Sequence, residues 1–518
     1  MLKSTGAMGA ATLTSRILGM VREMFYSHFM GDTPVASAFK LAFQIPNLFR
    51  RLLGEGALTV AFIPIFKLKE KTAGQTEMWR AANAVISGLI VVSAAIIGLV
   101  MLGITIALSV HSFGANTVLM LRLLRLMFPY MLMVCLAAIF MGMLNARGRF
   151  FIPALGAAVL NLVMIASVVF LAPHWGNDLH TQIFALAVGV LMAGTAQTLF
   201  QLPNLRSVGF RYAWVSPWKN DTVREVVRKM LPGTIGVAAF QINVLVTGLV
   251  ANWVDKRMYA SFDYAVRLME LPQGVFGISL ATFLLPTLTG LAIEKKYPEF
   301  RNTLAQGLNH LIFINLLASI LLFVLADPII RLIFEHGRFT PASTARAAWA
   351  LTFLAPGLVA FSVVNILARG FYALGDTKTP MKISMVCFGV NLIFALLFVG
   401  PLRQGGLGLA NSLSAVFNMF LLFFALRKKM KFLELAEFRR NLVPLFFCAA
   451  AAGVSAWFAN RFWVKFIGHE TIWDKIGAAF VPIILSAAVY FSFAMLLKVP
   501  SAREILAFLL SKLGKPKF

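Results

Sequence analysis

Charged side chains interrupt three otherwise apolar segments, and these charges have the most evident chemistry in the chain. They are Arg16, Arg22 and Glu23 in segment 5–30; Lys40, Arg50, Arg51 and Glu55 in segment 35–66; and Arg267 and Glu270 in segment 258–292. An arginine at the centre of a membrane helix costs about 2.5–3.5 kcal/mol on insertion scales, so it normally faces a partner or an aqueous cavity. We therefore expect these residues to line a binding site.

The spacing of these charges allows two interpretations. Arg51 and Glu55 stand at i,i+4 and Arg267 and Glu270 at i,i+3, so each pair can be a structural ion pair on a helix. Ion pairs cannot neutralise every cation, because lysine and arginine outnumber the carboxylates in the three segments. A phosphate or diphosphate group could neutralise the remaining positive charge, since a guanidinium group binds phosphate through two hydrogen bonds and stays charged.

No motif for bond-making chemistry accompanies these charges. The sequence has no Walker A loop, HExxH pair or nucleophile motif, and Cys135, Cys387 and Cys448 stand isolated in apolar runs. Isolated cysteines of this kind pack as small hydrophobic residues. We expect a transporter with no catalytic residue, metal site or cofactor, and the sequence leaves open which monovalent ion, if any, is coupled to transport.

The composition places these residues in a membrane protein. Of the 518 residues, 59% are hydrophobic and 13% are charged, and the mean hydropathy is +0.81. Soluble domains contain about 45–50% apolar and about 25% charged residues, so the composition disfavours a water-soluble fold. The net charge of +26 would suggest nucleic acid in a soluble protein, but here the accumulation of lysine and arginine in cytoplasmic loops explains it. We therefore expect no nucleic-acid partner.

Apolar segments recur along the whole chain and predict an all-α integral membrane protein of roughly fourteen transmembrane helices. The segments lie at 5–30, 35–66, 82–109, 118–145, 152–172, 181–203, 230–252, 258–292, 305–327, 344–372, 381–400, 405–426, 441–462 and 475–497. Lysine and arginine concentrate in alternate connections, which predicts an even number of spans with both termini in the cytoplasm. The first segment lacks the features of a cleavable signal, so we expect it to be retained as a helix.

A weak internal repeat predicts two halves. Arg125 to Leu171 and Leu351 to Val399 each read as a long helix, a tight turn, a proline opening the next helix and then Asn-Leu. The alternative is that bundle helices look alike by composition. The repeat predicts pseudo-symmetric six-helix lobes at 1–215 and 222–430, with two further helices and a cytoplasmic tail at 431–518. Many transporters of repeated halves bind their substrate at the midplane.

At the charged residues the chain resembles the MurJ (MviN) family, bacterial lipid II flippases of the MATE-like multidrug/oligosaccharidyl-lipid/polysaccharide exporter (MOP) superfamily. The similar stretches are T-S-R-I-L-G-M-V-R-E at 14–23, F-Q-I-P-N-L-F-R-R-L-L-G-E-G-A-L-T-V-A-F-I-P at 43–64, Y-A-V-R-L-M-E-L-P-Q-G-V at 264–275 and F-Y-A-L-G-D-T-K-T-P at 371–380. The resemblance covers essentially the whole chain. It implies two lobes around a cationic cavity, with the last two helices forming a groove for a polyprenyl tail.

The resemblance also implies which residues serve the site. The arginines expected to bind the diphosphate are Arg16, Arg22, Arg50 and Arg267. Supporting or gating roles are expected for Ser15, Glu23, Asn47, Arg51, Glu55 and Glu270. The chain departs from the family at Ser37 and Val266, where relatives carry Asp, and at Lys40, where an apolar residue is common. These departures make the expected cavity more cationic.

Together these features favour a flippase that moves lipid II, the undecaprenyl-diphosphate-linked disaccharide-pentapeptide of peptidoglycan biosynthesis, to the periplasmic leaflet of the bacterial inner membrane. We expect alternating access driven by the membrane potential, with membrane lipids as partners and cell-wall synthesis proteins as candidate partners. The alternatives are a flippase for another polyprenyl-diphosphate-linked saccharide and a MATE-like drug/ion antiporter. A membrane glycosyltransferase is a further alternative, but it would need clustered carboxylates at the membrane face.

Overall fold

The computed structural model describes the chain apart from residues 1, 53–56, 219, 431–435 and 506–518, and every element described is a helix. The chain divides into two compact units. Unit 1 comprises Met1–Ala260 with His336–Arg338, and unit 2 comprises Ser261–Glu335 with Phe339–Phe518.

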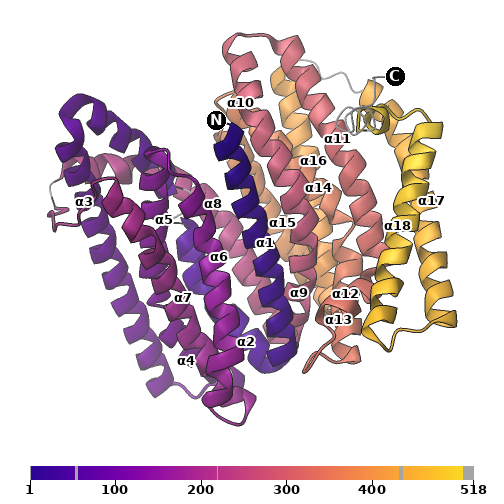
Figure 1. Cartoon of the computed structure of the whole chain (residues 1–518), viewed down its shortest axis with the longest axis horizontal. Helices are drawn as coiled ribbons and strands as arrows, with labels where there is room; N and C mark the ends of the chain where they lie inside the picture. The colour runs from indigo at the N-terminus through magenta and orange to yellow at the C-terminus, as the bar shows by residue number, and fades with distance from the viewer. Residues whose placement is uncertain (1, 53–56, 219, 431–435, 506–518) are drawn as a thin grey trace. The chain divides into compact units, whose positions relative to one another are not determined.

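The helices are labelled in Figure 1. Those of unit 1 are α1 (Leu2–Met30), α2 (Pro34–Phe49), α3 (Ala57–Val110), α4 (Ala115–Met127), α5 (Tyr130–Ala146), α6 (Phe151–Ala166), η2 (Ser167–Leu171), η3 (Ala172–His174), α7 (Leu179–Ser207) and α8 (Asp221–Val254). Helix α9 (Met258–Pro272) begins in unit 1 and continues in unit 2. Those that follow are η4 (Gln273–Ile278), α10 (Ser279–Ile293), α11 (Tyr297–Val324), α12 (Ala326–Phe334), α13 (Pro341–Leu354), α14 (Gly357–Ala373), α15 (Lys378–Leu402), α16 (Gln404–Met430), α17 (Ala436–Phe466) and α18 (Ile472–Leu496).

A tight turn joins α1 to α2 and brings the first two charge-bearing helices together. Gly31 ends α1 with a φ of +56°, which glycine adopts without steric strain, and its N–H donates to the Ser27 carbonyl at 2.9 Å. Helix α2 then begins at once, because the Thr33 side chain accepts from the Ala36 N–H at 3.2 Å and Pro34 occupies the first turn. The sequence thus contains both a stop and a start signal here.

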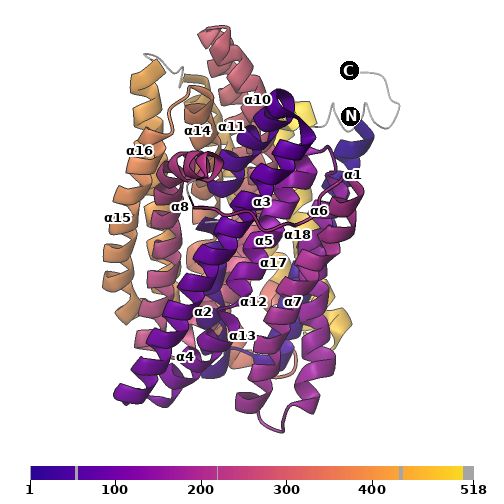
Figure 2. The same cartoon turned by 90° about the vertical axis from the view of Figure 1, so that its left-hand side faces the viewer.

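The interior of unit 1 is formed by close helix packing. Helices α3, α5 and α7 lie side by side (Figure 2). Helix α7 approaches α5 at Gly194, where an added Cβ atom would lie 2.6 Å from the Tyr130 ring. The buried Gln201 side chain donates through Nε2 to the Ala137 carbonyl at 3.0 Å, so a hydrogen bond links the two helices.

In unit 2, the last two helices pack against α11, as the yellow pair in Figure 1 shows. The Phe313 and Tyr490 ring centroids are 5.0 Å apart, and the Tyr490 hydroxyl donates to the Phe313 carbonyl at 2.8 Å. Both side chains are buried, so the contact combines apolar burial with a satisfied hydroxyl group. The pair α17–α18 is therefore anchored on unit 2.

Within the described residues, each unit contains one bent helix pair. Helices α4 and α5 meet at 43° next to Pro129, and α13 and α14 meet at 49° next to Pro356. Proline lacks the N–H that would continue the helical ladder, which accounts for a break at these positions. In both units the second helix has 17 residues and is followed by a glycine with positive φ, Gly148 at +77° and Gly375 at +73°. These two elements match the repeat seen in the sequence.

The all-α membrane fold predicted from the sequence is confirmed. Within the described residues, nine helices are long and apolar enough to cross a membrane, or up to eleven when each bent pair counts as one span. The segment expected as one helix at 35–66 is divided between α2 and α3, and α3 continues through a kink at Gly74 into the segment expected at 82–109. The total of roughly fourteen spans and the lobe boundaries at 215 and 222 stay predictions.

Candidate functional site

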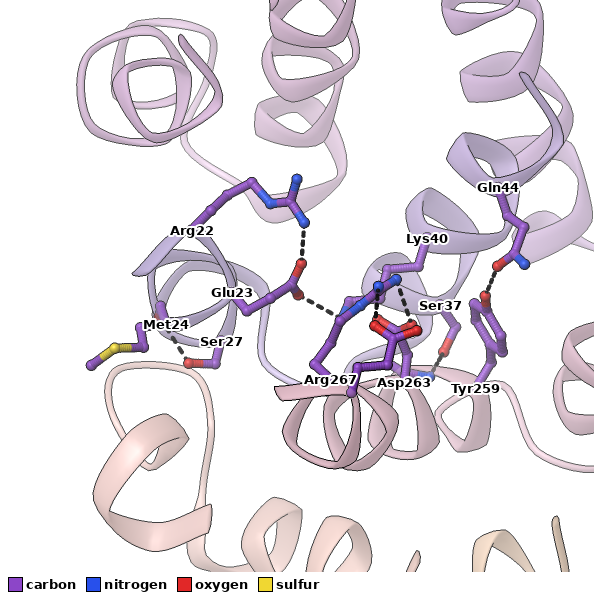
Figure 3. Close-up of polar contacts among 12 residues, drawn as sticks. Arg22, Glu23, Met24, Ser27, Ser37, Lys40, Gln44, Tyr259, Asp263 and Arg267 are labelled. Carbon is purple, nitrogen blue, oxygen red and sulfur yellow. Dashed lines mark hydrogen bonds and ion pairs between the residues drawn. The ribbon is translucent and has the colours of Figure 1, made fainter. Parts of the chain in front are cut away.

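A buried carboxylate on α1 lies between two cations in unit 1. Glu23 accepts from Arg22 Nη2 at 2.6 Å through Oε1 and from Lys40 Nζ on α2 at 3.3 Å through Oε2 (Figure 3). Glu23 and Lys40 are only 4% and 7% exposed, so both charges are removed from bulk water. We call Arg22, Glu23 and Lys40 the Glu23 cluster. The Glu23 cluster contains two cationic side chains and one carboxylate, so its formal charge is one positive charge.

Arg22 is held in place by two further contacts. Its Nη1 donates to Asn161 Oδ1 on α6 at 3.1 Å, and its guanidinium carbon lies 5.3 Å from the Tyr26 ring centroid. Asn161 in turn donates through Nδ2 to the Ser15 carbonyl at 3.1 Å. Asn161 therefore fastens α6 to α1 at two points. Ser15, expected as a supporting residue, makes this contact through its backbone.

Arg16 lies two helical turns before Glu23 on α1 and is half-buried. As far as the described residues go, it makes no hydrogen bond or ion pair. No described carboxylate cancels its charge by contact, so it can bind an anionic ligand without first breaking an internal ion pair. Diphosphate binding by Arg16 stays a prediction.

The arginines that follow α2 meet neutral oxygen atoms. Arg50 Nε donates to Asn47 Oδ1 at 2.6 Å, and Arg51 Nη1 donates to Gln241 Oε1 on α8 at 3.3 Å. An amide oxygen orients a guanidinium group without neutralising its charge. The expected pair of Arg51 with Glu55 lies outside the described residues, because Glu55 is not among them.

Ser37, at the position where relatives carry an acid, forms a hydrogen bond between two helices. Its buried hydroxyl oxygen accepts from the Ala260 N–H at 3.1 Å (Figure 3). About two turns further along α2, Gln44 accepts a hydrogen bond from the Tyr259 hydroxyl. Neutral side chains therefore join α2 to the start of α9 within unit 1.

Arg267 on α9 is paired with two carboxylates of its own helix in unit 2. Nη1 donates to Glu270 at 2.9 Å, which is one of the two interpretations that the spacing allowed. Nη2 donates to Asp263 at 3.2 Å (Figure 3). The side chains of Arg267 and Glu270 are 34% and 46% exposed. A ligand anion that binds Arg267 would therefore have to compete with both carboxylates.

The two units differ in the charge that their site residues carry. Among the described residues of α1, α2 and the turns next to them, the cations Arg16, Arg22, Lys40, Arg50 and Arg51 outnumber the acids Glu23 and Asp32. In unit 2 the single cation Arg267 is paired with two carboxylates, Asp263 and Glu270. The excess of positive charge is therefore a property of α1 and the α2 region. Val266, the other departure from the family, lies beside Arg267 in the sequence, and Asp263 one turn earlier supplies an acid.

Two of the residues that contact the expected arginines are amides distant in sequence, and sequence reasoning did not assign them to the site. Asn161 and Gln241 lie 139 and 190 residues from their partners Arg22 and Arg51 along the chain. Asn161 belongs to the Asn-Leu pair of the internal repeat, and Gln241 was an amide side chain inside an apolar segment. In the part of the chain that the structure describes, no group of His, Cys, Asp and Glu is arranged to hold a metal ion. The arrangement is suited to binding anions.

Known proteins resemble this chain over most of its length. A family model described as lipid II flippase MurJ matches residues 26–476. A protein of Burkholderia cenocepacia named lipid II flippase MurJ is 32% identical over 491 residues, which cover 93% of this chain and 94% of that protein. A protein of Haemophilus influenzae named probable lipid II flippase MurJ is 32% identical over 472 residues, 86% of this chain and 90% of that protein.

Solved structures share the fold. One described as lipid II flippase MurJ in an inward closed conformation superimposes with a TM-score of 0.77 at 23% identity, covering 95% of this chain and 98% of that chain. An inward-facing multidrug resistance MATE family transporter of the MOP superfamily gives a TM-score of 0.68 at 14% identity, covering 80% of this chain and 94% of that chain.

Proposed function

We propose that this chain, which belongs to the lipid II flippase MurJ family, moves lipid II from the cytoplasmic to the periplasmic leaflet of the bacterial inner membrane. The chain is a multi-pass membrane protein of a transporter family, so no bond of the substrate is made or broken. We place both termini in the cytoplasm. The observation that carries the proposal is the excess of positive charge on α1 and the α2 region.

The cations of unit 1 suit a diphosphate group. Arg16 has no described partner to displace, Arg50 contacts the amide oxygen of Asn47, and Arg22 contacts both the Asn161 amide oxygen and the Glu23 carboxylate. Guanidinium groups bind phosphate oxygens bidentately, and they remain charged at any working pH. A cationic drug would instead need carboxylates, which the site residues of unit 1 supply only at Glu23 among those described. The electrostatics therefore favour an anionic cargo.

The membrane potential is the proposed energy source for alternating access. Moving one charge across the membrane is worth about 2.3 kcal/mol per 100 mV. With the cell interior negative, an anionic head group moves outward downhill. The empty cationic site then returns inward downhill as well, so both halves of the cycle are driven in the required direction. Cell-wall synthesis proteins stay candidate partners.

The first experiment is complementation of a strain depleted of its own lipid II flippase. We expect the wild-type chain to restore growth, Arg16→Ala to abolish it, and Arg16→Lys to retain part of it because the charge remains. Arg80→Ala is the matched control, since the Arg80 side chain is 67% exposed and pairs only with a neighbour on its own helix. Growth with Arg16→Ala would refute the site assignment.

A second experiment measures export directly. Labelled lipid II should reach the outer leaflet in cells that express the wild-type chain, and collapsing the membrane potential should stop its appearance there. Continued export without a potential would eliminate the proposed driving force. Export of another polyprenyl-diphosphate-linked saccharide without lipid II would assign the same site a different cargo.

A further inference from the structure

A cavity of unit 1 lies among α3, α4 and α7, and none of the site residues described above lines it. Its volume is about 620 Å³. We call it the Arg122 pocket, and the residues that line it are Met101, Arg122, Arg125, Leu126, Pro129, Phe184 and Leu191. Two guanidinium groups therefore share a cavity whose other lining side chains are apolar.

The two arginines of the Arg122 pocket carry charges that no described carboxylate neutralises by contact. Arg122 is exposed, and in the part of the chain that the structure describes it makes no hydrogen bond or ion pair. Arg125 is half-buried, and its Nη1 donates to the Thr105 hydroxyl on α3 at 3.3 Å, a contact that leaves its charge in place. The two stand at i,i+3 on α4, where like charges repel each other. A bound anion would relieve this repulsion.

The helices around the Arg122 pocket have a lipid-facing surface. Helices α3 and α7 each contain a segment that is long and apolar enough to cross a membrane. Next to the pocket, Leu102 and Ile106 on α3 and Met192 on α7 are at least half exposed. Exposed apolar side chains on a spanning helix contact acyl chains. A ligand of the pocket can therefore enter it from the bilayer.

The two arginines lie near one surface of the membrane. Figure 1 shows α4 at the end of unit 1 that is remote from the start of α1. At a rise of about 1.5 Å per residue, Arg122 and Arg125 are about 10–15 Å along α4 from its first residue, Ala115. Long basic side chains at such a depth extend toward the bilayer surface, where the lipid phosphates lie. With both termini in the cytoplasm, as proposed above, this is the periplasmic surface.

We propose that the Arg122 pocket is a binding site for an anionic phospholipid of the outer leaflet. Its phosphate contacts Arg122 and Arg125, and an acyl chain lies against the apolar lining. A soluble phosphate would leave that lining unused, and a zwitterionic lipid would bring a third cation next to the two arginines. Because Pro129 lines the pocket at the 43° break between α4 and α5, the lipid contacts the bent pair where it breaks. The inference does not depend on the transported cargo.

The experiment titrates phosphatidylglycerol into the purified full-length chain in uncharged detergent. The first readout is the rise in unfolding temperature that a bound ligand causes, which yields the affinity. The second is a photoreactive phosphatidylglycerol, whose crosslinked peptides show where the lipid binds. We expect saturable stabilisation and crosslinks to the pocket residues of α4 and α7. Phosphatidylcholine with the same acyl chains, and glycerol phosphate without them, should each bind at least about tenfold more weakly.

Variants separate the charges from the apolar lining. Each basic side chain near a membrane surface strengthens binding of anionic lipid by about fivefold, so Arg122→Gln with Arg125→Gln should weaken it by about thirtyfold and remove the crosslinks. Arg122→Lys with Arg125→Lys keeps both charges and should retain most of the affinity. The matched control is Arg206→Gln with Arg224→Gln, which removes two exposed arginines elsewhere in unit 1 and should leave the pocket crosslinks unchanged.

Equal affinity of the wild type and the double glutamine variant would overturn the inference. Equal binding of phosphatidylcholine would overturn it as well, because the pocket would then recognise acyl chains alone. Displacement of the lipid by an equal concentration of glycerol phosphate would instead identify a site for soluble anions. If the double glutamine variant does not fold, Leu191→Trp decides, since it fills the cavity and keeps both arginines. Its crosslinks should disappear, and crosslinking at the wild-type level would refute the site.

Discussion

The turn between α14 and α15 contains a carboxylate whose contribution to stability can be worked out. Asp376 accepts from Lys429 Nζ on α16 at 2.6 Å, from the Thr379 hydroxyl at 2.8 Å and from the Thr379 N–H at 3.0 Å. Burial disfavours the charged form and by itself would raise the pKa of Asp376. The hydrogen bonds and the charge of Lys429 outweigh burial and lower the pKa from 3.8 to about 2.

A lowering of this size corresponds to about 2 kcal/mol of folding free energy at neutral pH. Asp376→Asn removes the charge but keeps an amide oxygen for the Thr379 N–H, so we expect a loss of about 1–2 kcal/mol. Asp376→Ala also removes that acceptor and should lose about 1 kcal/mol more. The measurement is the free energy of unfolding by denaturant titration in detergent micelles. Lys429→Met and the double variant complete a cycle that isolates the ion pair.

The pH dependence follows from the direction of the shift. Because the folded pKa lies below the unfolded value of 3.8, the stabilisation is fully present above that value and is lost as the pH falls toward about 2. The stability difference between wild type and Asp376→Asn should therefore be constant near neutral pH and shrink below about pH 4. Equal stability of the two proteins at pH 7 would refute this reasoning.

Two further predictions concern unit 1. Gly337→Ala should destabilise the protein by about 1–2 kcal/mol more than Gly148→Ala in thermal unfolding. Both glycines have positive φ, but only at Gly337 would the new Cβ lie 2.5 Å from the His28 carbonyl oxygen. Equal losses of stability in the two variants would contradict a steric cause. Asn161→Leu should lower lipid II transport and destabilise the fold by about 1–3 kcal/mol, since it removes a hydrogen-bond partner of Arg22. Wild-type transport by this variant would show that Arg22 is positioned without Asn161.

The contacts that could be predicted from the sequence are local ones. The pair Arg267–Glu270 follows from i,i+3 spacing on a helix, and Pro129 and Pro356 indicate where the bent pairs break. Helical geometry fixes these relations whatever the rest of the chain does. The membrane fold likewise follows from composition, because apolar segments of sufficient length have few alternatives in lipid.

The contacts that could not be predicted are those between helices distant in sequence. The bond of Arg22 to Asn161 depends on which face of α6 packs against α1, and many apolar faces would have been compatible with the same residues. The sharing of Glu23 between Arg22 and Lys40 depends in the same way on the rotation of α2 relative to α1. The sequence revealed the surplus of cations but not how each one is held.

The charges of α1 and α2 also have a consequence for biogenesis. In the part of the chain that the structure describes, neither helix is among the nine that are both long and apolar enough to cross a membrane by themselves, and α2 has only 16 residues. An arginine at the centre of an isolated helix opposes its release from the translocon into lipid by about 2.5–3.5 kcal/mol. Asn161, which contacts Arg22, is synthesised more than a hundred residues later. We therefore expect α1 and α2 to be released into the lipid only after α6 has been synthesised. The helices of unit 1 would then insert together and not one after another.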